Sequence, residues 1–212
     1  KTFANPIGLA AGFDKNAHMI PFFKKAGCGF VEVGSVSAEK SRGNPRPRLF
    51  RLPDDQALIN RMGLNNDGAS RIRHRLQRHA GQIAFPVGVN LAKTHDPKIE
   101  GDASIEDFCQ SFRTLAPWAD YIALNISCPN TAEGKTFEEP NALDRLLTAI
   151  MKERAEMNRR VPILVKFSPP HAERFVLDSL FDELLLVSLA HGVNGFIATN
   201  TASDRRNLIT PE

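Results

Sequence analysis

The sequence predicts an α/β fold of the (β/α)8 TIM-barrel class. Short apolar segments of strand length alternate with segments of helix length along most of the 212 residues. Polar residues follow the last four of these strands, at Asn90, Asn125, Lys166 and Asn200, which lie 35, 41 and 34 residues apart. That spacing is typical of successive βα units in a parallel sheet. A barrel brings the carboxyl ends of all its strands to one face, whereas a doubly wound sheet binds ligands only near a switch point, so polar residues after successive strands favour the barrel.

The first βα unit and the second strand occupy the amino-terminal part of the chain. Residues 5–11 form a short apolar strand that ends at Gly12. Residues 17–26 are predicted to be helical, because Gly27 follows as a helix stop. The second strand covers residues 30–33 and is closed by Gly34 and Ser35.

A long excursion separates the second strand from the third. It contains a basic, proline-rich loop at residues 41–48, two short extended pieces at 49–52 and 57–59, and an amide-rich segment at 60–66. Connections of this length are uncommon in compact domains and often carry function.

Four strands and four helices account for the rest of the chain. The predicted strands cover residues 85–89, 121–124, 162–165 and 195–198, and the predicted helices cover 70–80, 104–115, 141–157 and 175–190. Ser104, with Asp107 three residues on, is expected to cap the helix that it begins. Six strands are two fewer than a closed barrel needs. The chain also begins at Lys1 rather than Met, so we expect residues 1–212 to be a single barrel domain that is incomplete at both ends.

The composition indicates an ordinary globular domain. Apolar residues make up 42% of the chain and the formal net charge is +3. The three cysteines, Cys28, Cys109 and Cys128, have no CxxC spacing, which fits a reducing compartment and predicts no metal site. No apolar run approaches the roughly 18 residues that a membrane span needs.

Residues 121–131 are the strongest candidate for a site. A buried strand runs directly into a turn that holds Asn125, Ser127, Cys128, Asn130 and Thr131. Asparagine amides offer a donor and an acceptor, which suits the edge of a planar heterocycle, and a cysteine can act as a base. The alternative is a turn of common turn formers with an inert thiol. Lysines suit an anion, and the candidates are Lys15 and Lys166.

Seven segments of this chain resemble dihydroorotate dehydrogenases, especially the quinone-linked class 2 branch. The segments are residues 5–15, 29–35, 43–48, 59–65, 125–131, 165–166 and 199–201. They span the chain and keep the order that they have in the family. The resemblance implies an FMN-dependent barrel that oxidises dihydroorotate to orotate in pyrimidine (UMP) biosynthesis.

The resemblance also implies the roles of individual residues. The implied flavin contacts are Ala10, Ala11, Gly12, Ser35, Asn90, Asn125, Lys166 and Thr199. The implied orotate contacts are Lys15, Asn60, Arg61, Met62, Gly63, Leu64, Asn125, Asn130, Asn200 and Thr201. Cys128 takes the position of the base that removes a proton from C5 of dihydroorotate, while hydride passes from C6 to the flavin. Lys166, the second catalytic candidate, would stabilise negative charge on the reduced ring.

Cys128 departs from the class 2 pattern, because class 2 enzymes usually carry serine at this position and the class 1 enzymes carry cysteine. A free thiol titrates near pH 8.5, far below a hydroxyl, so the base should ionise more easily and the pH optimum should shift. Quinone is the electron acceptor that the class 2 framework implies, with peripheral contact at the inner (cytoplasmic) membrane through segments outside these residues. A class 1 acceptor, fumarate or NAD, with a cytoplasmic location is the alternative.

Two further alternatives remain open at this point. One is a related FMN barrel acting on another dihydropyrimidine or a dihydrouridine. Lys15 with Asn60, Asn130 and Asn200 argues against it, because these residues suit a free carboxylated ring. The other is a non-catalytic ligand-binding or nucleic-acid-binding domain that uses the basic residues at 41–48 and 71–78.

Overall fold

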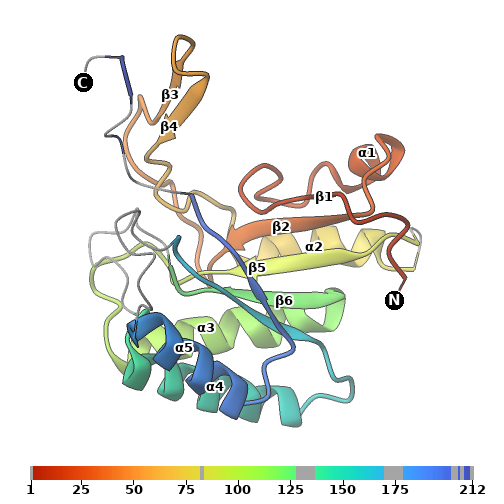
Figure 1. Cartoon of the computed structure of the whole chain (residues 1–212). Helices are drawn as coiled ribbons and strands as arrows, with labels where there is room; N and C mark the ends of the chain where they lie inside the picture. The colour runs from red at the N-terminus through yellow and green to blue at the C-terminus, as the bar shows by residue number, and fades with distance from the viewer. Residues whose placement is uncertain are drawn as a thin grey trace.

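A six-stranded parallel sheet organises the computed structural model of the chain, which describes residues 2–81, 84–127, 137–169, 179–201, 205 and 208–210. The strand order in the sheet, β1-β2-β5-β6-β7-β8, is also the order in the chain. The sheet curls, and helices α2, α3, α4 and α5 lie along its outer side (Figure 1). Six parallel strands in chain order, connected through five helices in the described residues, form part of a TIM barrel, so the predicted fold class is confirmed.

The bounds of the elements are close to those predicted for most of the chain. The parallel strands are β1 (Gly8–Leu9), β2 (Phe30–Val36), β5 (Val87–Leu91), β6 (Tyr121–Asn125), β7 (Ile163–Lys166) and β8 (Gly195–Ile197). The helices are α1 (Ile20–Lys25), α2 (Ala69–His79), α3 (Asp102–Leu115), α4 (Pro140–Ala155) and α5 (Ser179–Ala190), with a 3-10 turn at Ala116–Trp118. The excursion after β2 contains an antiparallel hairpin of β3 (Leu49–Leu52) and β4 (Ala57–Asn60).

The strands present two different faces, because successive side chains of a strand point to opposite sides. The outer set is apolar and packs under the helices; its fully buried members are Val31, Val33, Val89, Leu91, Ile122, Leu124, Ile163 and Val165. The helices contribute buried residues such as Phe112 of α3 and Leu146 of α4. Burial of each such side chain contributes about 1.5–3 kcal/mol, so this interface holds the helices to the sheet. The inner set is mixed: Phe30, Leu164 and Ile197 line the interior beside polar side chains such as Glu32 and Lys166, and these polar side chains can build a site.

The amino-terminal elements are shorter than predicted. The first strand is only β1, and α1 begins at Ile20 rather than at residue 17. The reason is Asp14, whose carboxylate accepts hydrogen bonds from the backbone N–H of His18 at 2.9 Å and of Met19 at 2.8 Å. These bonds hold residues 14–19 as a turn, and Pro21 then occupies the first turn of the helix, where its missing N–H is no loss.

β2 is longer than predicted, because Gly34 and Ser35 lie within it instead of closing it. The strand continues to Val36, which pairs with Leu91 after an irregularity in the register that begins at Val33. Asn90, predicted to follow the third strand, likewise lies inside β5.

The predicted capping box of the third helix is wrong. α3 begins at Asp102, and Ser104 lies inside it and donates its hydroxyl to the carbonyl of Ile99 at 2.9 Å. Asp107 instead accepts a hydrogen bond from the backbone N–H of Thr94 at 2.8 Å. Ser104 therefore bonds the segment just before the helix, and Asp107 bonds the loop after β5, so neither side chain caps α3.

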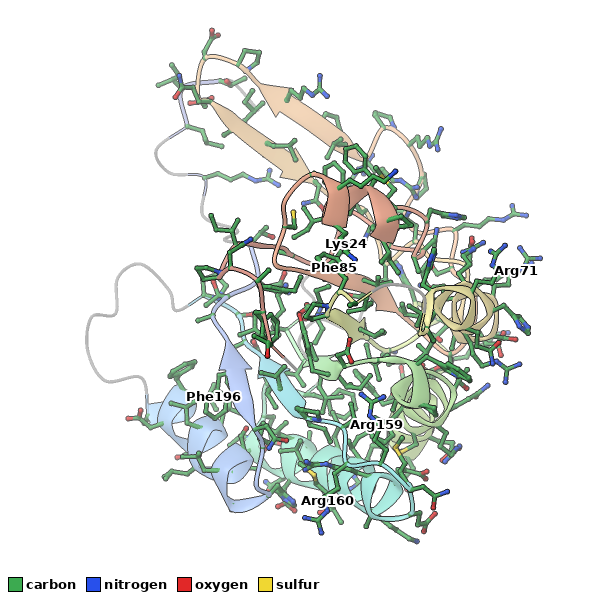
Figure 2. All side chains as sticks on the ribbon, turned by 90° about the vertical axis from the view of Figure 1, so that its right-hand side faces the viewer. Lys24, Arg71, Phe85, Arg159, Arg160 and Phe196 are labelled. Carbon is green, nitrogen blue, oxygen red and sulfur yellow. The ribbon has the colours of Figure 1, made fainter. Side chains whose placement is uncertain are left out.

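The arginine-rich helix α2 has the amphipathic pattern expected of it. Ile72 and Leu76 are buried, whereas Arg71 and Arg78 are exposed, and Arg71 extends away from the sheet (Figure 2). Arg75 forms an ion pair with Asp67 at 2.6 Å, which ties α2 to the segment that precedes it. None of the helices in the described ranges is long and apolar enough to cross a membrane.

Candidate functional site

A buried polar network begins at Glu32, on the inner face of β2. Its Oε2 accepts a hydrogen bond from the hydroxyl of Tyr121 at 3.0 Å, and its Oε1 accepts one from Nδ2 of Asn90 at 2.9 Å. Oδ1 of Asn90 in turn accepts a bond from the hydroxyl of Ser35 at 2.5 Å. Three neighbouring strands are thereby connected through buried side chains.

Asn125 extends this network to the end of β6 and to the segment after β8. Its Nδ2 donates to Oγ of Ser35 at 3.0 Å, and its Oδ1 accepts from the hydroxyl of Ser127 and from Nδ2 of Asn200, both at 3.2 Å. Asn200 also donates to Oγ of Ser127 at 3.0 Å. The convergence of Asn90, Asn125 and Asn200 at one end of the sheet is therefore as the strand rhythm predicted.

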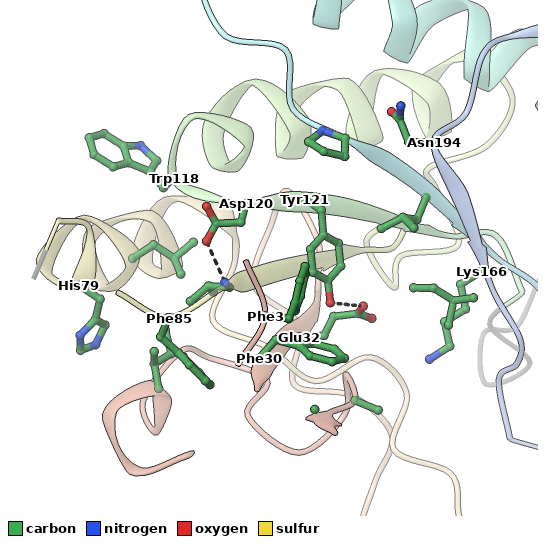
Figure 3. Close-up of a pocket in the computed structure, with 18 of the residues that line it drawn as sticks. Phe3, Phe30, Glu32, His79, Phe85, Trp118, Asp120, Tyr121, Lys166 and Asn194 are labelled. Carbon is green, nitrogen blue, oxygen red and sulfur yellow. Dashed lines mark hydrogen bonds between the residues drawn. The ribbon is translucent and has the colours of Figure 1, made fainter. Parts of the chain in front are cut away.

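Lys166 lies at the end of β7 and faces a cavity of about 1150 Å3 inside the curled sheet. The side chains of Glu32, Tyr121 and Lys166 contribute to its wall, together with Ala10 and Thr199 (Figure 3). Lys166 is only 7% exposed. Among the residues that the structure describes, none forms a hydrogen bond or ion pair with its ammonium group. A buried cation without a counter-charge is costly, so this position favours an anionic ligand.

The loop after β1 closes over the end of β2. The backbone N–H of Gly12 donates to the carbonyl of Gly34 at 2.7 Å, and Gly12 has a φ of 115°, which favours glycine. Gly34 is equally constrained, since a Cβ atom there would lie 2.5 Å from the carbonyl oxygen of Asn90. Ala10, Ala11 and Gly12 thus border the same end of the sheet as the network.

The predicted orotate residues of the excursion lie at the end of β4 and in the loop that follows it. Arg61 donates from Nε and Nη2 to the carbonyl of Pro47, at 3.1 and 2.9 Å, and the carbonyl of Gly63 lies 2.8 Å from Nδ1 of His95. Leu64 is buried, with a φ of 55°. The other members of this predicted set are Asn60 at the end of β4, Met62 in the loop, Lys15 between β1 and α1, and Thr201 next to Asn200. The hydrogen bonds of residues 60–64 run to the hairpin and to neighbouring loops, and among the described residues none joins the network.

The predicted base cannot be placed, because Cys128 and Asn130 lie outside the described residues. Both follow the carboxyl end of β6, immediately after Ser127, which is fully buried. Their roles stay predictions.

The sequence pattern does not identify two members of the network. Glu32 is a lone acid in an apolar strand and Tyr121 is the single tyrosine of the chain, and the pattern predicts only that each belongs to a strand. Burial, reinforced by the Glu32 carboxylate, raises the pKa of the Tyr121 phenol far above its usual range, so the phenol is a permanent donor. An acid at an inward position of a buried strand is the signal that would have found Glu32.

The part of the chain that the structure describes contains no group of three or more His, Cys, Asp or Glu side chains placed to hold a metal ion. The site described above instead combines amides, hydroxyls, the Glu32 carboxylate and the Lys166 ammonium. Such a set can bind a planar, partly anionic ring along its edge.

Comparison with known proteins gives a family for the whole chain. The dihydroorotate dehydrogenase family model matches residues 1–211. The chain is 44% identical over 211 residues to a protein of Chloroflexus aurantiacus named dihydroorotate dehydrogenase (quinone), covering 97% of the chain and 56% of that relative. A protein of the same name from Mycobacterium sp. (strain KMS) is 43% identical over 209 residues, covering 99% of the chain and 55% of the relative.

A solved structure shares the fold. The ligand-free DHODH of Eimeria tenella superposes with a TM-score of 0.87 at 32% identity, covering 100% of this chain and 62% of that one. The chain thus spans a little over half the length of the curated relatives that it matches.

Proposed function

Because the chain belongs to the dihydroorotate dehydrogenase family, we propose that the protein oxidises dihydroorotate to orotate in pyrimidine biosynthesis, with FMN as cofactor and a quinone as electron acceptor. The names of the relatives from Chloroflexus aurantiacus and Mycobacterium support the quinone. Quinones are carried in membranes, and we therefore place the enzyme at the inner membrane surface, in peripheral contact with it.

The observation that carries this proposal is the buried ammonium of Lys166, which has no hydrogen-bond or ion-pair partner among the described residues. At 7% exposure it has lost most of its hydration, and it faces the cavity, whose wall also includes Glu32, Tyr121 and Thr199. An anionic ring in the cavity would supply the missing counter-charge. A flavin fits this requirement, because its reduced form carries negative charge and its edge carries both donors and acceptors.

The residues proposed to hold FMN are those at the carboxyl end of the sheet. They are Ala10, Ala11, Gly12, Ser35, Asn90, Asn125, Lys166 and Thr199. The alanines and Gly12 leave room for a flat ring, while the amides donate to its edge. When bound, the flavin supplies the acceptor for hydride.

The proposed substrate site uses residues beside this row, together with the loop after β4. Asn125 and Asn200 would orient the pyrimidine edge, and Lys15 would pair with the substrate carboxylate. Asn60, Arg61, Met62, Gly63, Leu64, Asn130 and Thr201 complete the proposed set. Cys128 is proposed to remove the proton from C5, which its thiolate does more readily than a serine hydroxyl.

The test is dihydroorotate oxidation by the purified full-length protein, with quinone, fumarate and NAD compared as acceptors. We expect a flavin absorption band and turnover that is fastest with quinone. Preference for fumarate or NAD would assign a class 1 acceptor, and a protein without flavin would refute the proposal.

Replacement of Cys128 tests the proposed base. Cys128→Ala should reduce turnover by about 10²–10⁴-fold, the usual contribution of a general base, with FMN still bound. Cys28→Ala is the matched control, since Cys28 is a partly exposed free thiol that lies before β2. Equal turnover of the two variants would remove Cys128 from the mechanism.

A further inference from the structure

Glu32, Gly88 and Tyr121 form a row across three neighbouring strands. Glu32 pairs in register with Gly88, and Gly88 pairs with Tyr121. A Cβ atom on Gly88 would lie 2.0 Å from the tyrosine ring, so the ring occupies the space that a side chain would need. Gly88 thereby allows the Tyr121 hydroxyl to cross β5 and reach the carboxylate of Glu32 (Figure 3).

The carboxylate determines the direction of every hydrogen bond that follows it. An ionised carboxylate only accepts, so Asn90 must turn its Nδ2 toward Glu32 and its Oδ1 toward Ser35. Ser35 then has to donate to Asn90, which leaves its oxygen to accept from Nδ2 of Asn125. Oδ1 of Asn125 is left to accept from Ser127 and Asn200.

This direction leaves donors available at the site. Asn90 and Asn125 each use one N–H of the amide group within the network, and neither amide nitrogen makes a further hydrogen bond to a described residue. If both amides were reversed, each would present an oxygen to a ligand instead of an N–H group. The same side chains would then favour a ligand edge that donates hydrogen bonds instead of an anionic edge that accepts them.

Stability does not explain an acid at this position. Glu32 is 5% exposed and has two hydrogen-bond partners but no cation among them. Burial of a carboxylate is costly, and neutral replacements of buried charged groups are often no less stable. An ionised carboxylate does have one property that its neutral isostere glutamine lacks: it accepts hydrogen bonds and cannot donate them.

We propose that Glu32, supported by Tyr121, is a positioning residue that orients the amides of Asn90 and Asn125 so that their remaining N–H groups donate to the flavin. The inference rests on the proposed function, because it assumes that the ligand beside these amides is FMN. Glu32 acts through Asn90 and Ser35 and does not touch the reacting atoms.

The test variant is Glu32→Gln, which keeps the shape of the side chain but can both donate and accept. The orientation of the amides is then no longer unique. We expect the dissociation constant of FMN, measured by fluorescence titration of the full-length apoprotein, to rise about tenfold for one lost N–H donor. The flavin midpoint potential should fall, and a tenfold preferential weakening of reduced-flavin binding corresponds to about 30 mV. Tyr121→Phe retains the carboxylate and should change both values in the same direction by less.

Asp107→Asn is the matched control, because it also neutralises a buried carboxylate, one that lies on α3 and is bonded to Thr94. It should alter stability and leave the FMN dissociation constant and midpoint potential unchanged.

A double-mutant cycle distinguishes an effect that passes from Glu32 through Ser35 to Asn125 from a general disturbance of the fold. In a Ser35→Ala background the path from Glu32 to Asn125 is already interrupted, whereas Asn90 still bonds Glu32 directly, so Glu32→Gln should weaken FMN binding by less than it does in the wild type. If Glu32→Gln does not fold, Tyr121→Phe takes its place in the cycle.

Two outcomes would overturn the inference while leaving the proposed function intact. One is an equal effect of Glu32→Gln on FMN affinity in both backgrounds, and the other is a wild-type midpoint potential and FMN affinity in Glu32→Gln. A wild-type protein without flavin would instead refute the proposed function, and the inference with it.

Discussion

Replacement of Lys166 by Met should stabilise the apoprotein and weaken its binding of FMN. The side chain keeps its length and loses its charge. Lys166 is 7% exposed and its ammonium has no partner among the described residues. Replacing buried charged groups with apolar side chains of similar volume often stabilises by roughly 1–4 kcal/mol. At about 2–4 °C per kcal/mol, a gain of about 2 kcal/mol would raise the melting temperature by about 4–8 °C.

The same substitution should act in the opposite direction on the cofactor. A hydrogen bond to a charged group contributes about 1.5–3 kcal/mol, so the FMN dissociation constant should rise by about 10–150-fold. The assay is thermal unfolding of the apoprotein beside fluorescence titration with FMN. Lys152→Met, on the exposed face of α4, is the control and should change neither value. A destabilised Lys166→Met apoprotein with unaltered FMN affinity would refute the reasoning, since it would mean that the ammonium is satisfied within the protein.

Two further predictions concern stability. Gly88→Ala should cost about 1–3 kcal/mol in urea unfolding, because its Cβ atom would lie 2.0 Å from the Tyr121 ring. The penalty should shrink when Tyr121 is also replaced by Ala, and a penalty that persists would place its origin elsewhere. Burial raises the pKa of Asp107, against the bonds from Thr94, so the folded protein binds this proton more readily than the unfolded chain does. Its contribution to stability should therefore increase as the pH falls through the raised pKa toward 3.8, the ordinary value. Asp107→Asn should lack that increase in urea titrations at several pH values, and identical pH profiles would contradict this assignment.

The strand positions and the barrel class followed directly from the pattern of residues. Runs such as residues 121–124 and 162–165 are buried strands within one or two residues of the predicted bounds. Such runs are predictable because local periodicity and burial agree there. The errors arose where a distant or local side chain changed the backbone: Asp14 shortens α1, and Thr94 takes Asp107 away from the cap of α3.

The sequence predicted several residues of the candidate site but not the hydrogen bonds that join them. Asn90, Asn125, Lys166 and Asn200 were identified because each comes at or just after a strand end. Glu32 and Tyr121 were not identified, because an acid or a phenol inside a strand has no meaning until its neighbours are known. The segment with Cys128 and Asn130 contains the predicted base and a predicted orotate contact, and it lies outside the described residues.

The clustering of polar groups at the carboxyl ends of the strands could be inferred from the sequence, because side-chain alternation and strand order are local and topological properties. The contacts of Glu32 with Asn90 and of Ser35 with Asn125 became visible only in the folded chain. Ser35 lies 55 positions from Asn90 and 90 from Asn125, yet its hydroxyl is within 3.0 Å of both side chains. Contacts of that kind depend on strand register and on the absence of a side chain at Gly88. Both are set by packing across the whole sheet rather than by any segment alone.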